Sequence, residues 1–138
     1  MIVVDASVLA LALSDGSDEG DYFRQLLRGQ TVAAPELIDL EVQSVLRSGV
    51  RHRLLDERRA RQAWIDLANA PLQRAPHRPL LQRAWELRDN VTTYDAAYVA
   101  LAEILGATLL TADRKLADAP GIRCEVELVQ LPPSPEHL

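Results

Sequence analysis

Four carboxylates stand where metal-assisted chemistry could use them: Asp5, Glu41, Asp95 and Asp113. Asp5 directly follows residues 2–4, Ile-Val-Val, and Asp113 follows a second apolar run at residues 107–110. Short apolar runs of this kind predict buried strands, so both acids come soon after a strand. Carboxylates that converge repel one another, and the usual remedy is a hard divalent cation, Mg²⁺ or Mn²⁺, held through oxygen ligands. Such an ion can activate a water molecule for attack on a phosphodiester.

Asp95 lies in the first turn of an apolar helix predicted for residues 93–105, in the stretch VTTYDAAYVALAE. Thr92 is placed to be the N-cap, which puts Asp95 close to the acidic position of a capping box. A carboxylate there also suits the positive end of the helix dipole. Capping and a role in a site are compatible, because one carboxylate can serve both. The sequence leaves both roles open.

Glu41 falls on the apolar face of a helix expected from Pro35 to about Ser48. At about 100° per residue, it lies among the residues that define this face: Leu37, Ile38, Val42, Val45 and Leu46. A buried unpaired carboxylate is costly, so Glu41 requires a cation or a proton. The alternative is a glutamate at the edge of the face, or one paired with an arginine.

Other catalytic chemistries lack their residues. The histidines, His52, His77 and His137, are scattered at spacings that do not suit metal binding, and we expect them on the surface. The single cysteine, Cys124, excludes an internal disulfide and a cysteine metal site. Neither of the glycine-rich phosphate loops, GxxxxGK(S/T) and GxGxxG, is present. Ser7 has no obvious histidine partner and no G-x-S-x-G turn, which disfavours a serine nucleophile.

Strands alternate with helices along the chain, which predicts an α/β fold: a three-layer sandwich with a central, mainly parallel sheet. Helices are expected at residues 7–13, 19–28, 35–48, 56–70, 79–88 and 93–105, with a short one after residue 113. Strands are expected at residues 2–4, 31–34, around 72, 107–110 and 125–131. We expect residues 1–131 to form a single domain and residues 132–138 a flexible tail. Ligands in such folds bind beyond the carboxyl ends of the strands, so at least three of the acids should meet there.

The length of 138 residues suits one domain with a substantial core. No apolar run approaches the roughly eighteen residues that a membrane span needs. The apolar N-terminus has no basic segment and is interrupted by Asp5, so it does not resemble a signal peptide. A lone cysteine fits a reducing cytoplasm, where we expect the protein to act without membrane contact.

Four motifs, in order, resemble those of the PIN-domain ribonucleases, and within them the toxins of VapBC toxin–antitoxin systems. They are MIVVDASVLALAL with Asp5, APELIDLEVQSVL with Glu41, VTTYDAAYVALAE with Asp95, and LLTADRKLA with Asp113. Each motif alone is weak, but together they cover residues 1 to about 131. The resemblance implies a PIN-like fold and an endoribonuclease whose Mg²⁺, or Mn²⁺, is held by these four acids. It also implies that the hydroxyls of Ser7 and Thr111 help to hold metal, water or phosphate.

The resemblance further implies partners. The expected substrate is structured cellular RNA, a transfer or ribosomal RNA, cleaved by metal-activated water. A cognate antitoxin is expected to inhibit the enzyme by covering the site, and the protein is expected to form a homodimer. Operator DNA is expected to be contacted through the antitoxin. The extra acid that some members carry after the fourth motif has no clear counterpart here apart from Asp118, so the number of metal ions stays open.

The charge distribution offers candidate RNA contacts. The net charge of −5 argues against nucleic-acid binding, but ten arginines and only four acids lie between residues 47 and 88. A basic segment on an acidic protein can bind a polyanion, although the same charges can form an ordinary solvated helix surface. The candidates are Arg47, Arg51, Arg53, Arg58, Arg59 and Arg61.

Two other classes of function stay open. A catalytically silent PIN-like module could bind metal, RNA or a protein without cleaving anything, although all four acids and both hydroxyls are present. A Mg²⁺-dependent phosphotransfer enzyme with an aspartate nucleophile would need a D-x-D pair after the first strand, where this chain has Ser7 instead.

Overall fold

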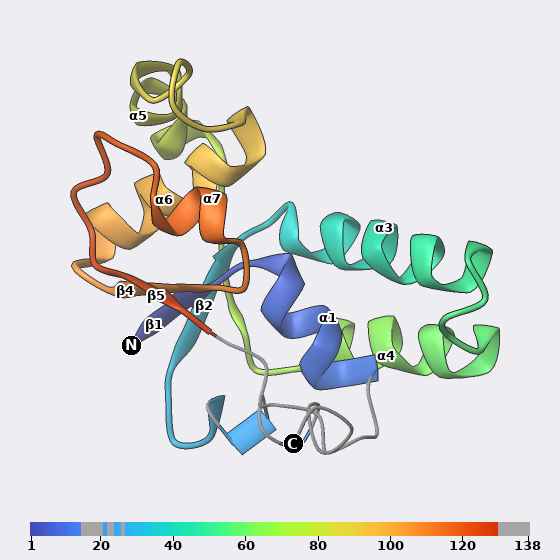
Figure 1. The fold of residues 1–138 in the computed structure, drawn as a ribbon. Helices are drawn as coiled ribbons and strands as arrows, with labels where there is room; N and C mark the ends of the chain where they lie inside the picture. The colour runs from blue at the N-terminus through green and yellow to red at the C-terminus, as the bar shows by residue number, and fades with distance from the viewer. Residues whose placement is uncertain (15–20, 22–23, 26, 130–138) are drawn as a thin grey trace, which may run out of the picture.

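The structure is a computed structural model that describes residues 1–14, 21, 24–25 and 27–129. Its strands are β1 (Ile2–Val4), β2 (Val32–Pro35), β3 (Gln73–Ala75), β4 (Thr108–Thr111) and β5 (Val126–Leu128). Its helices are α1 (Ala6–Ser14), α3 (Ile38–Arg51), α4 (Glu57–Asn69), α5 (Leu81–Glu86), α6 (Thr93–Leu105) and α7 (Arg114–Ala117), with the 3₁₀ turn η1 (Arg78–Leu80) leading into α5. The chain alternates between strands and helices, as predicted (Figure 1).

The five strands form one parallel sheet in the order β3-β2-β1-β4-β5. At its centre, Val3 of β1 lies opposite Ala33 of β2 and Leu109 of β4. Every residue of β1 is apolar and buried, as expected for a parallel strand that is covered on both faces. Because all strands run the same way, their carboxyl ends lie at one edge of the sheet, and this edge positions the candidate site.

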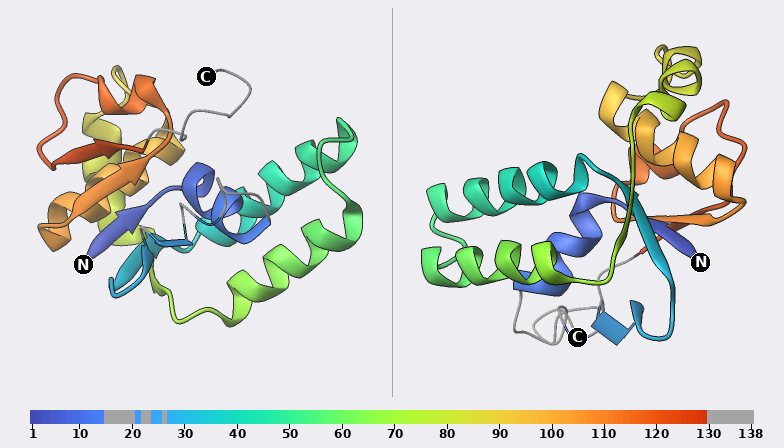
Figure 2. Two further views of the ribbon diagram at one scale, coloured as in Figure 1. Left: turned by 60° about the horizontal axis from the view of Figure 1, so that its bottom comes forward. Right: turned by 180° about the vertical axis from the view of Figure 1, so that it is seen from behind.

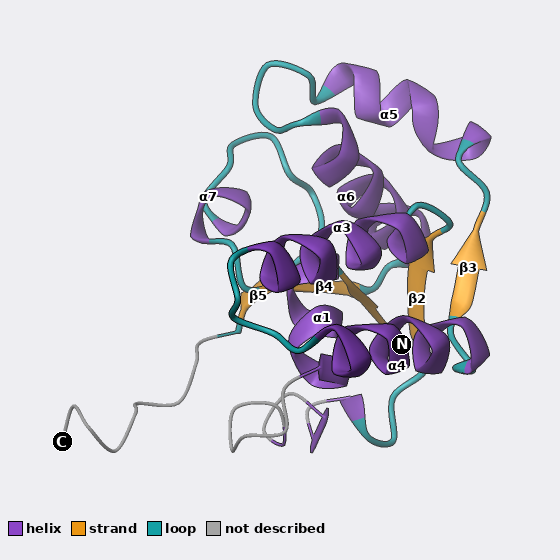
Figure 3. Cartoon of the chain, turned by 90° about the vertical axis from the view of Figure 1, so that its right-hand side faces the viewer, coloured by secondary structure: helices purple, strands orange, loops and turns teal. Residues whose placement is uncertain are grey.

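Helices cover both faces of the sheet and complete the predicted three-layer sandwich. α6 packs against β1, β2 and β4, and α5 packs against α6. α1, α3 and α4 pack on one another, and α1 also touches β4. Figure 2 shows these two helix groups from two directions, and in Figure 3 α5 and α6 lie above the strands with α1 and α4 below. α3 and α4 form a hairpin, the α3–α4 hairpin, that extends beyond the sheet (Figure 1).

Helix α6 runs through the core of the molecule, and all of its residues from 96 to 102 are buried. This burial explains why the stretch after Asp95 carries no charge. The helix begins after Thr92, whose hydroxyl accepts a hydrogen bond from the backbone N–H of Asp95 at 3.2 Å. It ends at Gly106, which has a left-handed backbone (φ 61°) that glycine adopts without steric cost. Both ends were predicted from the sequence.

Two predicted element boundaries are wrong. Pro35 does not open a helix; it ends β2, and α3 begins at Ile38. Proline's fixed φ also suits an extended strand, and Pro35 continues the ladder to Ala75 of β3. The helix expected at residues 79–88 is η1 followed by the shorter α5.

One prediction about burial also fails. Val45, expected on the buried face of α3, is 45% exposed, whereas Ile38, Val42 and Leu46 of the same face are buried. The helix expected at 19–28 falls largely outside the described residues, and the tail 132–138 falls wholly outside them. None of the described helices has the length and apolar character that crossing a bilayer requires.

Candidate active site

The carboxyl edge of the sheet brings Asp5 next to Thr111, because β1 and β4 are neighbouring strands. The Asp5 carboxylate accepts hydrogen bonds from the hydroxyls of Ser7 (2.5 Å) and Thr111, and another from the backbone N–H of Val8 (3.3 Å). Asp5 and Thr111 are both buried. Burial raises the pKa of Asp5, and these hydrogen bonds oppose the rise. The two hydroxyls named from the sequence therefore hold the Asp5 carboxylate in one orientation.

Asp113 lies two residues beyond β4, at the start of α7. Its carboxylate accepts a hydrogen bond from the backbone N–H of Lys115 (2.9 Å), and its own backbone N–H donates to the Thr111 hydroxyl (3.0 Å). The backbone N–H of Ala112 donates to the Ser7 hydroxyl (3.3 Å), which joins this turn to the start of α1. Asp113 therefore caps α7 through Oδ1, and Oδ2 is not used by the cap.

Asp95 faces the same edge from the first turn of α6. Burial raises the pKa of Asp95, the Thr92 hydroxyl lowers it by a hydrogen bond, and the charges of Asp5 and Asp113 raise it further. Asp95 and Asp113 also line one cavity, and the Thr111 hydroxyl bonds both the Asp5 carboxylate and the backbone N–H of Asp113. The three acids therefore lie at the same edge of the sheet, and their joint role in a site stays a prediction.

Glu41 reaches the same cluster from the first turn of α3, where it is half-buried. Burial raises the pKa of Glu41, the Tyr98 hydroxyl lowers it, and the charges of Asp95 and Asp5 raise it further. The ion pairs found among the described residues do not include Glu41. Pairing with an arginine therefore does not explain its position on α3.

Tyr98 is a neighbour of the site that sequence reasoning did not identify. The residue is 1% exposed, and its hydroxyl is a buried polar atom without a hydrogen-bond partner among the described residues. Burial and the nearby charge of Glu41 raise its pKa, so the hydroxyl stays protonated at neutral pH and can donate. It lies beside the Glu41 carboxylate but outside hydrogen-bond geometry. A tyrosine at this helical position is typical of a core residue, so the sequence gives no signal of this contact.

We call the four acids Asp5, Glu41, Asp95 and Asp113 the acidic cluster, because the charges of some of them raise the pKa of Glu41 and of Asp95. Within the described residues, no three carboxylate, histidine or cysteine side chains already stand at the spacing of a metal centre. The donor set nevertheless fits a hard divalent cation, since all its donors are oxygens and their charges repel. An ion there would offset the repulsion that raises the pKa of Asp95 and of Glu41. The unpaired hydroxyl of Tyr98 could then bond a reoriented Glu41.

A cavity of about 460 Å³ opens beside the acidic cluster. It is lined by two of the four acids, Asp95 and Asp113, and by two cations, Arg88 and Lys115, among other residues. We call this space the acidic cleft. Sequence reasoning did not single out either cation, although Lys115 is the only lysine of the chain and lies within the fourth motif.

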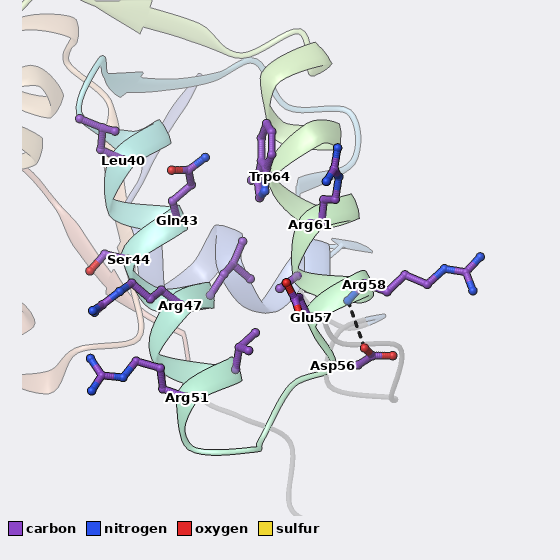
Figure 4. Close-up of a pocket in the computed structure, with 13 residues that line it drawn as sticks. Leu40, Gln43, Ser44, Arg47, Arg51, Asp56, Glu57, Arg58, Arg61 and Trp64 are labelled. Atoms are coloured by element: carbon purple, nitrogen blue, oxygen red, sulfur yellow. Dashed lines mark hydrogen bonds between the residues drawn. The ribbon is translucent and has the colours of Figure 1, made fainter.

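The six arginines named from the sequence lie elsewhere, on the α3–α4 hairpin. Four of them line a groove of about 1010 Å³ between the two helices: Arg47, Arg51, Arg58 and Arg61 (Figure 4). Arg53 lies in the turn of the hairpin with a positive φ of 57°. Arg59 donates a hydrogen bond to the carbonyl of Ser14 (2.6 Å). None of the four acids lines this groove.

Comparison with known proteins shows the family. Residues 2–122 match the PIN domain family. The chain is 43% identical to Ribonuclease VapC1 of Mycobacterium tuberculosis over 129 residues, which cover 93% of this chain and 97% of that protein. It is 44% identical to the VapC ribonuclease Mb0985 of Mycobacterium bovis, over 94% of this chain and 98% of that protein.

Solved structures agree on the fold at lower identity. VapC20 of Mycobacterium tuberculosis, described as a sarcin-ricin loop cleaving toxin, matches with a TM-score of 0.66 at 18% identity, over 84% of this chain and 92% of that one. VapBC2 of Rickettsia felis, bound to a promoter DNA fragment, matches with a TM-score of 0.64 at 18% identity. The match covers 93% of this chain and 98% of that one. The motifs, the parallel sheet and these relatives lead to one conclusion: the chain belongs to the PIN-domain family and, within it, to the VapC-type ribonucleases.

Proposed function

We propose that the protein is a metal-dependent endoribonuclease toxin that cleaves structured cellular RNA and is inhibited by a cognate antitoxin. The observation that carries this proposal lies at the carboxyl edge of the parallel sheet, where Ser7 and Thr111 hold the Asp5 carboxylate and where Asp95 and Asp113 line one cavity. So many neighbouring negative charges disfavour the folded state by themselves, so their presence supports a role in binding a cation. The relatives named as ribonucleases support the reaction class.

In this proposal the acidic cluster holds Mg²⁺, with Mn²⁺ as a substitute, and the ion supplies an activated water and neutralises charge on the phosphate. Asp5 is the most constrained of the proposed ligands, because Ser7 and Thr111 fix its orientation. Asp113 and Asp95 contribute from the starts of two helices. Glu41 completes the proposed set of ligands from α3.

The substrate and the partners are finer parts of the same proposal. A transfer or ribosomal RNA is the proposed substrate, in keeping with VapC20, whose description names the sarcin-ricin loop. The α3–α4 hairpin arginines stay a prediction as RNA contacts. Solved relatives of the same fold include toxin–antitoxin complexes, one of them on promoter DNA. We propose a cytoplasmic homodimer that meets operator DNA only through its antitoxin.

A second candidate is a catalytically silent module that binds metal, RNA or a protein. The same four carboxylates could hold a divalent ion in such a module without any bond being broken. The two candidates differ in whether phosphodiester bonds are broken, so a cleavage assay separates them.

The test is cleavage of total cellular RNA by the purified protein, freed of any antitoxin, with Mg²⁺, with Mn²⁺ and with EDTA. Asp95→Asn, purified in parallel, exposes contaminating nucleases. Asp66→Asn on α4 removes one carboxylate outside the acidic cluster and is the matched control. We expect discrete fragments that need metal, persist in Asp66→Asn and vanish in Asp95→Asn. A folded, metal-binding protein that cleaves nothing would contradict the proposal and favour the silent module.

A further inference from the structure

We infer that the acidic cleft binds phosphates of the RNA strand through Arg88 and Lys115, next to the bond that is cut. This inference rests on the proposed function and deepens it, because it names a substrate-binding site other than the groove between α3 and α4. Its ligand is the phosphate backbone of single-stranded RNA at the cleavage point.

The charge of the acidic cluster creates the need for such a site. RNA is a polyanion, and its backbone must approach four carboxylates before any bond can break. One or two divalent ions neutralise part of this charge, and the flanking phosphates still need cations of their own. The acidic cleft provides two cations, Arg88 and Lys115, on the same walls that carry Asp95 and Asp113.

Contacts with Trp85 orient the Arg88 side chain. Its guanidinium lies over the ring of Trp85, 4.7 Å from the ring centre, and its Nη1 donates to the carbonyl of Trp85 (2.9 Å). A guanidinium has five N–H donors, so several are left for a ligand. The side chain is exposed and takes part in none of the ion pairs of the described residues. A stacked, oriented guanidinium suits a phosphate, which it can bind through two oxygens.

Lys115 is the second cation that lines the acidic cleft. Its backbone N–H donates to the Asp113 carboxylate, which fixes the start of its side chain relative to that acid. The side chain is exposed and, like Arg88, is absent from the ion pairs of the described residues. A flexible ammonium group can follow a phosphate as a point charge. A strand in the cleft would therefore meet two cations that share its lining with Asp95 and Asp113.

The arginines of the α3–α4 hairpin do not line the acidic cleft. Arg47 and Arg61 line the groove between α3 and α4, which contains none of the four acids (Figure 4). The control therefore uses two other exposed arginines, Arg28 and Arg78, which line neither this groove nor the acidic cleft. Replacing either pair by glutamine removes two positive charges from the protein.

The experiment measures binding of a short single-stranded RNA by fluorescence anisotropy at several salt concentrations. All proteins carry Asp95→Asn so that the RNA stays intact. The reference protein is compared with Arg88→Gln/Lys115→Gln and with Arg28→Gln/Arg78→Gln. The RNA is about four nucleotides long, the lower end of single-strand site sizes. Circular dichroism checks that each protein is folded.

We expect the first pair of substitutions to reduce the slope of log affinity against log salt by about 1.4, since each phosphate contact contributes about 0.7 for a single strand. The second pair should change the slope by less than half as much. Arg88→Lys should keep most of the slope but bind more weakly, because lysine keeps the charge and loses the planar contact. This variant also keeps the test valid if the double substitution does not fold.

Two results would overturn the inference. An unchanged slope in Arg88→Gln/Lys115→Gln means that no phosphate is bound there, and an equal loss in both pairs means that the effect is one of overall charge. Either result leaves the proposed function intact as long as the wild-type protein cleaves RNA. Failure of the proposed function is a different outcome: the wild-type protein cleaves no RNA with any metal.

Discussion

At the scale of single residues, Asp95 combines a structural role with a proposed catalytic one. Its backbone N–H is bonded by Thr92 whatever the side chain, and its carboxylate is repelled by Asp5 and Asp113. Asp95→Asn should therefore abolish metal-dependent cleavage while lowering the free energy of unfolding by no more than about 1 kcal/mol, within the range of a lost cap interaction. Chemical denaturation beside the cleavage assay checks both parts. A mutant that unfolds, or one that cleaves normally, contradicts the dual role.

Tyr98 yields a second prediction at this scale. Its hydroxyl is buried without a partner among the described residues, so in the metal-free protein it does not stabilise the fold by hydrogen bonding. Tyr98→Phe should leave the free energy of unfolding unchanged or raise it by up to about 1 kcal/mol, because an unsatisfied polar atom is removed at constant shape. Thermal unfolding in EDTA measures this change. A loss of more than about 2 kcal/mol would show that the hydroxyl is bonded after all.

At the scale of elements, one ion pair ties α5 to α6. Arg83 of α5 donates through Nε and Nη2 to both carboxylate oxygens of Glu103 on α6, at 2.7 and 3.2 Å. Glu103 also accepts the backbone N–H of Arg123 (2.9 Å), and both side chains of the pair are largely buried. Glu103→Gln should lower the free energy of unfolding by about 1–3 kcal/mol, since it leaves a shielded guanidinium without its counter-charge.

This ion pair also makes stability depend on pH. Burial raises the pKa of Glu103, but the Arg83 guanidinium and the Arg123 contacts lower it more, so its net value is depressed. A carboxyl with a depressed pKa stabilises the fold above its unfolded value and loses that effect as pH falls through the folded value. The difference in free energy of unfolding between wild type and Glu103→Gln should therefore become smaller below about pH 4. Urea titrations at neutral and acidic pH measure it.

Asp39→Asn is the matched control for the α5–α6 pair. Asp39 of α3 binds Arg74 of β3 through two contacts, at 2.7 and 2.9 Å, but it is 41% exposed. Arg74 also donates to the carbonyl of Leu67 (2.7 Å), just as Arg83 donates to the carbonyl of Gly121 (2.7 Å), so the two pairs differ mainly in exposure. The loss of stability should be below about 1 kcal/mol. A loss as large as that of Glu103→Gln would contradict the explanation that an ion pair contributes more to stability when it is buried.

At the scale of the whole molecule, the acidic cluster joins β1, α3, α6 and the turn after β4. A divalent ion bound there should stabilise the fold as a whole, by about 2.7 kcal/mol at roughly one hundred times its dissociation constant. Thermal unfolding with increasing Mn²⁺ or Mg²⁺ should show a rising midpoint that is absent in Asp5→Asn. Asp66→Asn should behave as wild type. Equal shifts in all three proteins would place the ion elsewhere.

The sequence by itself determined much of this protein. Hydrophobic runs of strand length between amphipathic helices specified the parallel sandwich, and the cap at Thr92 and the stop at Gly106 were readable because they depend on neighbouring residues. The motifs around the four acids identified the family. Asp5 and Asp113 could be placed at one edge of the sheet, because the ends of parallel strands must meet there.

Other features were decided by the tertiary structure alone. The partner of a side chain depends on which surfaces pack, so no local pattern shows Tyr98 beside Glu41 or Thr111 bonded to Asp5 across 106 positions. Packing likewise left the arginine-rich hairpin extending beyond the sheet and put Arg88 and Lys115 in the acidic cleft. The number of charged residues in a segment does not show where their side chains lie in the folded protein. Only the arrangement of the helices around the sheet determines which cations lie beside the acids.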